Sequence, residues 1–176
     1  MTLSTLNILL PQSAALTPAI VLLQSHPSHI AQVANWHHQE CERQGLKSSL
    51  ALRQQRLMLH MQSSSIPKTF IALRAGELVG CVSLVNYTYR TSQRMPKVSS
   101  PSPVWLSNLY VPGYMRRLGI GSQLIEAAKD YARELQQGEL WLSASEYTEY
   151  YQKRGWQIER KTRLAGTPVN VMRIDL

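Results

Sequence analysis

Residues 109–122 combine the residue types that bind a phosphate-bearing ligand. They read LYVPGYMRRLGIGS, so an apolar segment leads through two arginines to two glycines, just before a helical pattern begins. The first N–H groups of a helix have no partner within the helix, and the helix dipole favours negative charge there. Gly119 and Gly121 have no Cβ and let a phosphate approach the backbone. Arg116 and Arg117 can add charge-assisted hydrogen bonds. The stretch therefore predicts a pyrophosphate-binding loop.

Two familiar phosphate-binding loops do not fit this stretch. A Walker loop requires Gly-Lys followed by Ser or Thr, which the stretch lacks. A dinucleotide-binding fingerprint requires a third glycine where the chain has Leu124, and an early position in the chain. The remaining alternative is a strand-to-helix turn that binds no ligand.

A second block of residues, 150–156, makes the first more informative. It reads Tyr-Tyr-Gln-Lys-Arg-Gly-Trp and is similar to the Phe-Tyr-x-x-x-Gly-Phe block of the GNAT superfamily of acetyl-CoA-dependent N-acetyltransferases. Residues 116–121, Arg-Arg-Leu-Gly-Ile-Gly, match that family's (Gln/Arg)-x-x-Gly-x-(Gly/Ala) signature, and the preceding Leu-Tyr-Val-Pro also resembles the family. The two blocks occur in the family's order and separation, and the resemblance extends from about Val21 to Leu176.

The resemblance implies a binding role for each residue of the first block. Main-chain groups of Leu109, Tyr110 and Val111 would pair with the pantetheine arm of acetyl-CoA where the central strands separate. Backbone N–H groups of the following segment would hold the pyrophosphate; its members are Arg116, Arg117, Leu118, Gly119, Ile120, Gly121 and Ser122.

The resemblance also implies one catalytic residue, Tyr151, whose hydroxyl would protonate the CoA thiolate as it leaves. The chemistry agrees, because a nearby O–H donor stabilises the negative charge that develops on sulfur. The alternative interpretation of Tyr151 is a core aromatic side chain. Tyr150 is expected to take no part, because adjacent helical residues point in different directions.

The chain departs from the family at two places. Ala144 stands where many members have an asparagine, and residues 140–143 lack the glutamate that some members use as a general base. The base is therefore left open between a water chain and a residue such as Glu40 or His37. Residues 36–41, Trp-His-His-Gln-Glu-Cys, are interpreted either as an ordinary helix segment or as a wall of the acceptor pocket. Adjacent histidines point about 100° apart on a helix, which disfavours a metal site.

The apolar periodicity predicts the elements that position these residues. Helices are expected after Pro27 and after Ser48 or Ser49, the second with Leu50, Leu57, Met58 and Met61 on its inner side. Further helices are expected over residues 119–136 and 146–154. Strands are expected over residues 19–24, 68–74, 78–89, 104–111, 139–144, 156–164 and 169–176.

This order of elements, β-αα-βββ-α-β-α-ββ, predicts an α/β (α+β) fold. Its central sheet is mixed and mostly antiparallel, with helices on both faces, and the resemblance implies the GNAT (acyl-CoA N-acyltransferase) fold. One domain is expected over residues 19–176. Residues 1–18 are expected to form an irregular arm, and residues 90–102 an exposed loop.

Composition narrows the function class. With 44% apolar and 17% charged residues, the chain is typical of folded globular domains. No apolar run reaches the ~20 residues that span a bilayer, and no secretory signal is evident. Cys41 and Cys81 are the two cysteines, which favours a reducing cytoplasm. The net charge of +8 suits an anionic ligand, but no nucleic-acid-reading motif accompanies it.

The sequence thus predicts an N-acetyltransferase that moves the acetyl group of acetyl-CoA to a primary amine in a ternary complex, without a metal. Expected partners include neither nucleic acid nor membrane, and a homodimer is left open. The acceptor is open among aminoglycosides, polyamines, amino acids, small peptides and protein N-termini. The alternative is a non-catalytic acyl-CoA-binding module of the same fold, which the missing asparagine and glutamate favour and Tyr151 opposes.

Overall fold

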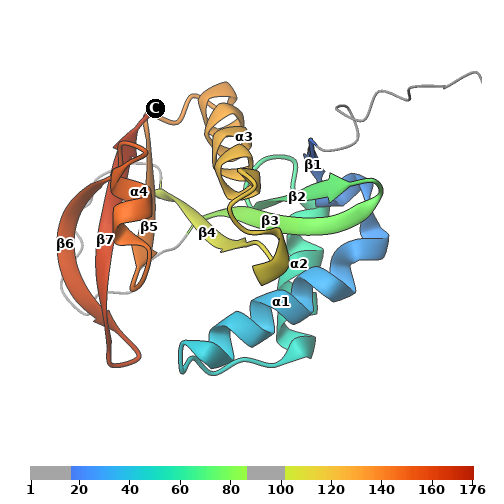
Figure 1. Ribbon diagram of the computed structural model, residues 1–176, viewed down its shortest axis with the longest axis horizontal. Helices are drawn as coiled ribbons and strands as arrows, with labels where there is room; N and C mark the ends of the chain where they lie inside the picture. Colours follow the sequence, from blue (N-terminus) through green and yellow to red (C-terminus); the bar gives the residue numbers. More distant parts are fainter. Residues whose placement is uncertain (1–16, 87–101) are drawn as a thin grey trace, which may run out of the picture.

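The computed structural model describes residues 17–86 and 102–176, and its elements follow the predicted order (Figure 1). The strands are β1 (Ala19–Leu22), β2 (Lys68–Arg74), β3 (Glu77–Asn86), β4 (Val104–Tyr110), β5 (Glu139–Ala144), β6 (Gln157–Leu164) and β7 (Thr167–Asp175). The α-helices are α1 (Ile30–Arg43), α2 (Leu50–Gln62), α3 (Ile120–Glu134) and α4 (Thr148–Gln152). Short 3₁₀ turns are η1 (Leu23–Ser25), η2 (Pro27–His29) and η3 (Gly113–Met115). The expected N-terminal arm and the expected loop over residues 90–102 fall almost entirely outside the described residues.

One parallel pair interrupts an otherwise antiparallel sheet of order β1-β2-β3-β4-β5-β7-β6. β4 and β5 run parallel and are paired through Trp105 and Trp141 alone. Beyond that pair the two strands diverge (Figure 1). On its other edge β4 stays paired with β3 as far as Tyr110. The end of β4 therefore has one edge without a strand partner, at the centre of the sheet.

A bulge reshapes β4 at that place. β3 advances from Cys81 to Ser83 while β4 runs from Ser107 to Tyr110, so β4 carries one extra residue. Asn108 has a φ of 54°, a left-handed conformation that asparagine tolerates better than most residues. Bulges bend a strand and redirect its side chains, and they are common beside functional sites.

Helices cover both faces of the sheet, as predicted, and each face has its own core. Successive side chains of a strand point to opposite faces. Phe70 of β2 therefore packs in the cluster under α3, whereas Ile71 packs in the cluster under α1 and α2. α3 contributes Ile120, Leu124, Ile125, Ala128 and Ala132 to the first cluster, and α1 and α2 contribute Val33, Ala34, Trp36 and Leu57 to the second.

The buried side of α2 differs from the prediction. Leu50 and Met58 are 40% and 45% exposed, whereas Leu57 and His60 are buried. His60 can be buried because its Nδ1 lies 2.7 Å from the hydroxyl of Thr69, which in turn lies 2.8 Å from Ser83 Oγ. The spacing of apolar residues could not predict that this side of α2 buries a histidine, because the hydrogen-bond partners of His60 lie in other elements. Among the described residues, no helix has the length and apolar character needed to cross a membrane.

Candidate active site

The segment between β4 and α3 forms a loop that ends at the N-terminus of α3. The side chain of Arg116 donates a 2.9 Å hydrogen bond to the carbonyl oxygen of Val111 and so ties the loop to the end of β4. Gly119 caps α3 with a φ of 79°, and no side chain caps the helix. A Cβ on Gly119 would meet no described atom closer than Gln123 Nε2, 4.0 Å away. The first N–H groups of α3 are therefore open to a ligand.

A cavity of about 1040 Å³ lies against this loop. Three of its lining residues come from the end of β4 and the residue after it, namely Leu109, Tyr110 and Val111. Seven come from the loop and the first turn of α3, namely Met115, Arg116, Arg117, Gly119, Ile120, Gly121 and Ser122. Tyr151 of α4 also lines the cavity, whereas the side chain of Leu118 does not and is 53% exposed. The fold thus brings all the predicted site residues except the Leu118 side chain to one cavity.

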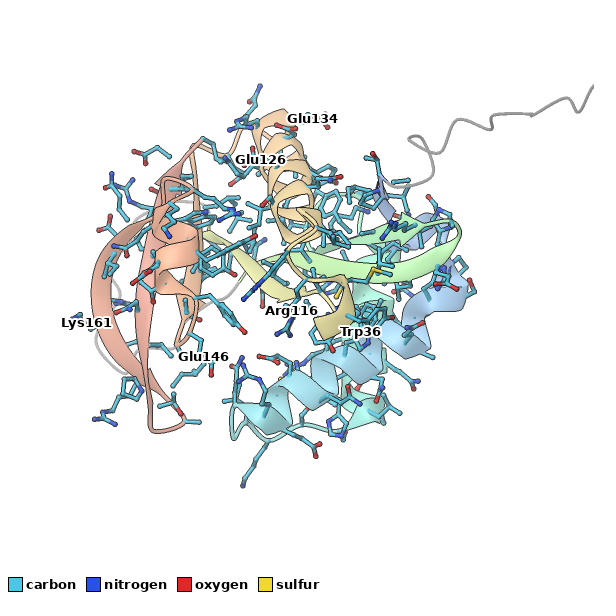
Figure 2. The ribbon with its side chains drawn as sticks, in the orientation of Figure 1. Trp36, Arg116, Glu126, Glu134, Glu146 and Lys161 are labelled. Carbon is cyan, nitrogen blue, oxygen red and sulfur yellow. The ribbon has the colours of Figure 1, made fainter. Side chains whose placement is uncertain are left out.

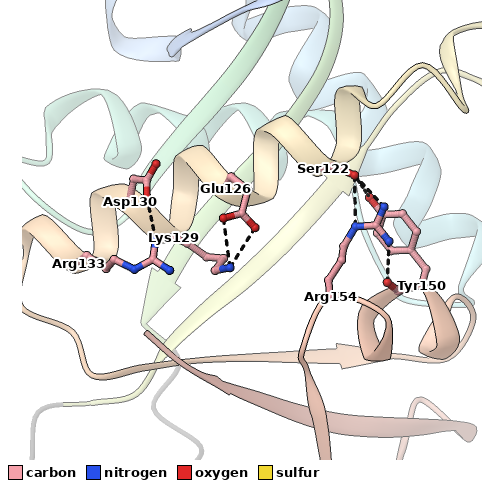
Figure 3. Close-up of polar contacts among 7 residues, drawn as sticks. All are labelled: Ser122, Glu126, Lys129, Asp130, Arg133, Tyr150 and Arg154. Atoms are coloured by element: carbon pink, nitrogen blue, oxygen red, sulfur yellow. Dashed lines mark hydrogen bonds and ion pairs between the residues drawn. The ribbon is translucent and has the colours of Figure 1, made fainter.

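Two further residues of this cavity, Tyr150 and Arg154, were missed in the sequence. Arg154 donates hydrogen bonds of 2.8 and 3.2 Å to the hydroxyl of Ser122, and one of 2.8 Å to the carbonyl oxygen of Tyr150 (Figure 3). These bonds hold a cationic side chain beside the N-terminus of α3. The sequence feature that could have predicted this contact is the four-residue spacing of Tyr150 and Arg154, which puts both on one side of a helical turn.

Tyr150 also changes the interpretation of Gly121. Tyr150 was expected to point away from the site, but it lines the same cavity as Tyr151. A Cβ on Gly121 would lie only 3.0 Å from the Tyr150 hydroxyl oxygen. In this structure the missing side chain of Gly121 makes room for Tyr150, which gives the glycine a packing role. Its role beside a phosphate stays a prediction.

A second cavity, of about 540 Å³, adjoins the first. Both cavities are lined by Glu40, Arg43, Leu109, Tyr147 and Tyr151, which mark the boundary between them. Glu146 lies just before α4 (Figure 2). It forms a 3.0 Å ion pair with Arg43 at the end of α1. This pair joins two sides of the second cavity.

Tyr151 is held at the boundary by two aromatic neighbours. Its ring meets Tyr150 edge-on at a centroid distance of 5.3 Å and Trp156 at 6.1 Å. Burial raises the pKa of the Tyr151 hydroxyl well above its usual value, and nearby Arg154 only partly opposes this. Tyr151 is therefore protonated at neutral pH and can act as a hydrogen-bond and proton donor.

The structure separates the two candidate bases. Glu40 lines both cavities and accepts hydrogen bonds from Arg43 and Gln44, and the Arg43 bond holds the pKa of Glu40 below its usual value. His37 lines neither cavity, and its Nε2 lies 3.8 Å from Cys81 Sγ. Burial lowers the pKa of His37 to about 3. Of the two, Glu40 lines the cavities and His37 does not.

Comparison with known proteins gives one family and one fold. Residues 30–156 match the model of the acetyltransferase (GNAT) family. Ribosomal-protein-alanine N-acetyltransferase from Brucella melitensis has a TM-score of 0.67 at 16% identity, over 90% of this chain and 99% of that one. A GNAT-family acetyltransferase from Streptococcus pneumoniae has a TM-score of 0.63 at 19% identity, over 90% and 99%.

A third similar structure is larger than this chain. N-acetylglutamate synthase from Neisseria gonorrhoeae, complexed with coenzyme A and N-acetyl-glutamate, has a TM-score of 0.65 at 19% identity. The match covers 90% of this chain and 35% of that one, so this chain spans about a third of its length. No curated protein sequence matches the chain. The predicted fold is confirmed, and at these identities the solved structures support the fold alone.

Proposed function

This chain belongs to the acetyltransferase (GNAT) family, and we propose that it transfers the acetyl group of acetyl-CoA to a primary amine. The observation that carries the proposal is that two adjoining cavities share Tyr151. A transfer within a ternary complex needs two substrates bound side by side, with a proton donor where they meet.

The larger cavity suits acetyl-CoA. The pyrophosphate would lie at the uncapped N-terminus of α3, where Gly119 leaves space and Arg116, Arg117 and Arg154 supply positive charge. The pantetheine arm would extend along residues 109–111, on the β4 edge that has no strand partner beyond Trp105. These features support the binding roles expected from the sequence.

The chemistry proceeds by direct attack. The neutral amine nitrogen bonds to the thioester carbonyl carbon, and a backbone N–H near Val111 stabilises the oxyanion. The carbon–sulfur bond then breaks, and the leaving thiolate takes the hydroxyl proton of Tyr151. The proton that the nitrogen loses passes to water or to Glu40. Cys81 is disfavoured as the nucleophile of an acyl-enzyme, because it lines neither cavity and its burial raises the pKa of the thiol to about 12.

The compartment and the acceptor also belong to this proposal. We place the protein in the cytoplasm, because Cys41 and Cys81 are both free thiols. The fold alone does not select the acceptor, since similar structures are named for ribosomal-protein alanine and for N-acetylglutamate.

The test combines binding with turnover. Acetyl-CoA at 100 times its Kd should stabilise the folded protein by about 2.7 kcal/mol, and ATP and NAD should do much less. A panel of amines should then release free thiol from acetyl-CoA. Equal stabilisation by ATP and acetyl-CoA would indicate a generic anion site. Specific binding of acetyl-CoA without thiol release by any amine would favour the non-catalytic module.

A further inference from the structure

Two arginines of α2 bring positive charge to the second cavity and form no ion pair with a carboxylate of the described residues. Arg53 and Arg56 both line this cavity and lie three residues apart, on one side of the helix. Arg53 Nε donates a 2.8 Å hydrogen bond to Ser48 Oγ, which orients the side chain and leaves its terminal nitrogens available. The pair can bind an anion.

The carboxylates of the second cavity are engaged elsewhere. Glu40 and Glu146 are both bonded to Arg43, at 2.7 and 3.0 Å. Glu40 and Arg43 line both cavities, whereas Arg53 and Arg56 line the second alone. The carboxylate of Glu40 therefore lies at the boundary with the first cavity, and the two unpaired arginines belong to the part that the first cavity does not share.

This distribution matches a ligand with charges of both signs. An approaching amine can donate a hydrogen bond to the Glu40 carboxylate at the boundary, whose charge Arg43 partly balances. A carboxylate is attracted to the two guanidinium groups, which bind it with paired hydrogen bonds. Of the residues that the structure describes, three arginines and two glutamates line the cavity, so this lining has an excess of positive charge and opposes polycationic ligands. A volume of about 540 Å³ is of the size that binds small molecules.

We propose that the acceptor is an amine that also carries a carboxylate, which Arg53 and Arg56 bind while the amine lies beside Glu40 and Tyr151. This inference rests on the proposed function and specifies its second substrate. The carboxylate has two sources, the α-carboxylate of a free amino acid or an acidic side chain of a short peptide. Both present the same group to the arginines.

The test uses matched ligands that differ only in this charge. Protein saturated with CoA, which cannot transfer an acetyl group, is titrated by calorimetry. One arm compares glycine with glycinamide and phenylalanine with phenylalaninamide. The other compares the C-terminal amides of glycyl-aspartate and glycyl-asparagine. We expect the carboxylate forms of at least one arm to bind about 10-fold more tightly, the scale of one charge-assisted hydrogen bond.

Variants then show which residues carry the preference. Arg53→Gln and Arg56→Gln should each reduce it to about 3-fold or less, and Arg56 is exposed, so its substitution spares the core. Arg160→Gln is the control, because Arg160 is an exposed arginine of β6 that lines neither cavity. Amino acids and their amides differ in the basicity of the amine, which also affects binding. This difference cancels when the affinity ratio of a variant is compared with that of the wild type.

Each result decides the inference. A preference in the first arm identifies amino acids, and one in the second identifies acidic peptides. The inference is overturned if no pair shows a preference, or if the preference survives in both variants. It is also overturned if both variants lose affinity for CoA, since the arginines would then serve that ligand. Binding of carboxylate ligands with no thiol release from acetyl-CoA would contradict the proposed transfer and leave the binding inference standing.

Discussion

The guanidinium carbon of Arg154 lies 3.5 Å from the centroid of the Tyr150 ring. The same guanidinium is hydrogen-bonded to the hydroxyl of Ser122 in the first turn of α3. A cation over an aromatic face is attracted by the ring's electrons, and the attraction strengthens when water is partly excluded. Tyr150 and Ser122 therefore hold Arg154 in one orientation at the edge of the larger cavity.

Arg154→Ala should weaken CoA binding by roughly 10-fold to 100-fold, because it removes a charged donor worth about 1.5–3 kcal/mol from the proposed phosphate site. Kd values for CoA from calorimetry test this. Lys153→Ala is the control, since Lys153 is an exposed neighbour that does not line the cavity. Equal effects of the two substitutions would show that only the overall charge matters.

Gly119→Ala should reduce CoA affinity by more than its effect on stability explains. The left-handed φ of Gly119 costs alanine about 1–2 kcal/mol. The new methyl group would project into open space that we assign to the pyrophosphate. Gly166→Ala in the β6–β7 turn is the control, with a φ of 84° and equally open surroundings. Both variants should lose similar melting temperature. Unchanged CoA affinity in folded Gly119→Ala would argue against the phosphate loop.

Tyr151→Phe should leave the fold and CoA affinity nearly unchanged and lower kcat by roughly 100-fold, the scale of a positioned acid. The hydroxyl matters when negative charge develops on sulfur, and the ring keeps its contacts with Tyr150 and Trp156. Tyr114→Phe is a suitable control, because Tyr114 is 76% exposed and lines neither cavity. Near-normal kcat in Tyr151→Phe would mean that water protonates the thiolate.

The pH dependence of kcat/KM should show a rising limb alone between pH 6 and 10. The rate rises as the amine loses its proton, with a pKa of about 8 for a peptide α-amino group. Burial raises the pKa of Tyr151 above its usual value near 10, so the acid keeps its proton throughout this range. A falling limb below about pH 9.5 would be inconsistent with Tyr151 as the acid.

Folding stability should decline with acidity because two histidines are buried. Burial lowers the pKa of His37 to about 3 and that of His60 to about 4. Between about pH 6.5 and these values the unfolded chain binds protons that the folded chain does not, so stability is present above pH 6.5 and lost below it. Each histidine should account for about 2 kcal/mol between pH 6.5 and 5.

Urea unfolding of variants at the two pH values measures this loss. The free energy of unfolding differs between pH 6.5 and pH 5, and His60→Gln should reduce this difference by about 2 kcal/mol. The reduction is expected whatever the substitution does to stability at pH 6.5. His29→Gln is the control, because His29 precedes α1 and lies outside both core clusters. An unchanged pH dependence in His60→Gln would show that His60 accepts a proton in the folded protein.

Much of the fold could be predicted because elements form from neighbours in sequence. Short apolar runs and helical spacings of apolar residues predicted, in order, the seven strands and four α-helices found in residues 17–86 and 102–176, with bounds within a few residues. Backbone conformations and helix caps that depend on neighbouring residues could also be predicted. Gly119 adopts the left-handed conformation that glycine favours, and Ser49 caps α2 with a hydrogen bond from Leu52 N.

Contacts between distant residues required the tertiary structure. The prediction that Leu50 and Met58 lie on the inner side of α2 was wrong. His60 is buried there instead, because it has hydroxyl partners in β2 and β3. The ion pair between Arg43 and Glu146 joins residues 103 positions apart. No local pattern specifies which side chains meet across a cavity.

The sequence by itself determined the family, the order of elements and the segment that faces the proposed pyrophosphate, because these depend on local spacing and backbone freedom. Only the tertiary structure decided that Tyr150 and Arg154 join that segment and that His37 lies away from both cavities. It also decided that Arg53 and Arg56 line the second cavity without carboxylate partners among the described residues. The physical reason is that burial and charge pairing depend on which elements pack together, and helices, strands and turns close in space are often far apart in the chain.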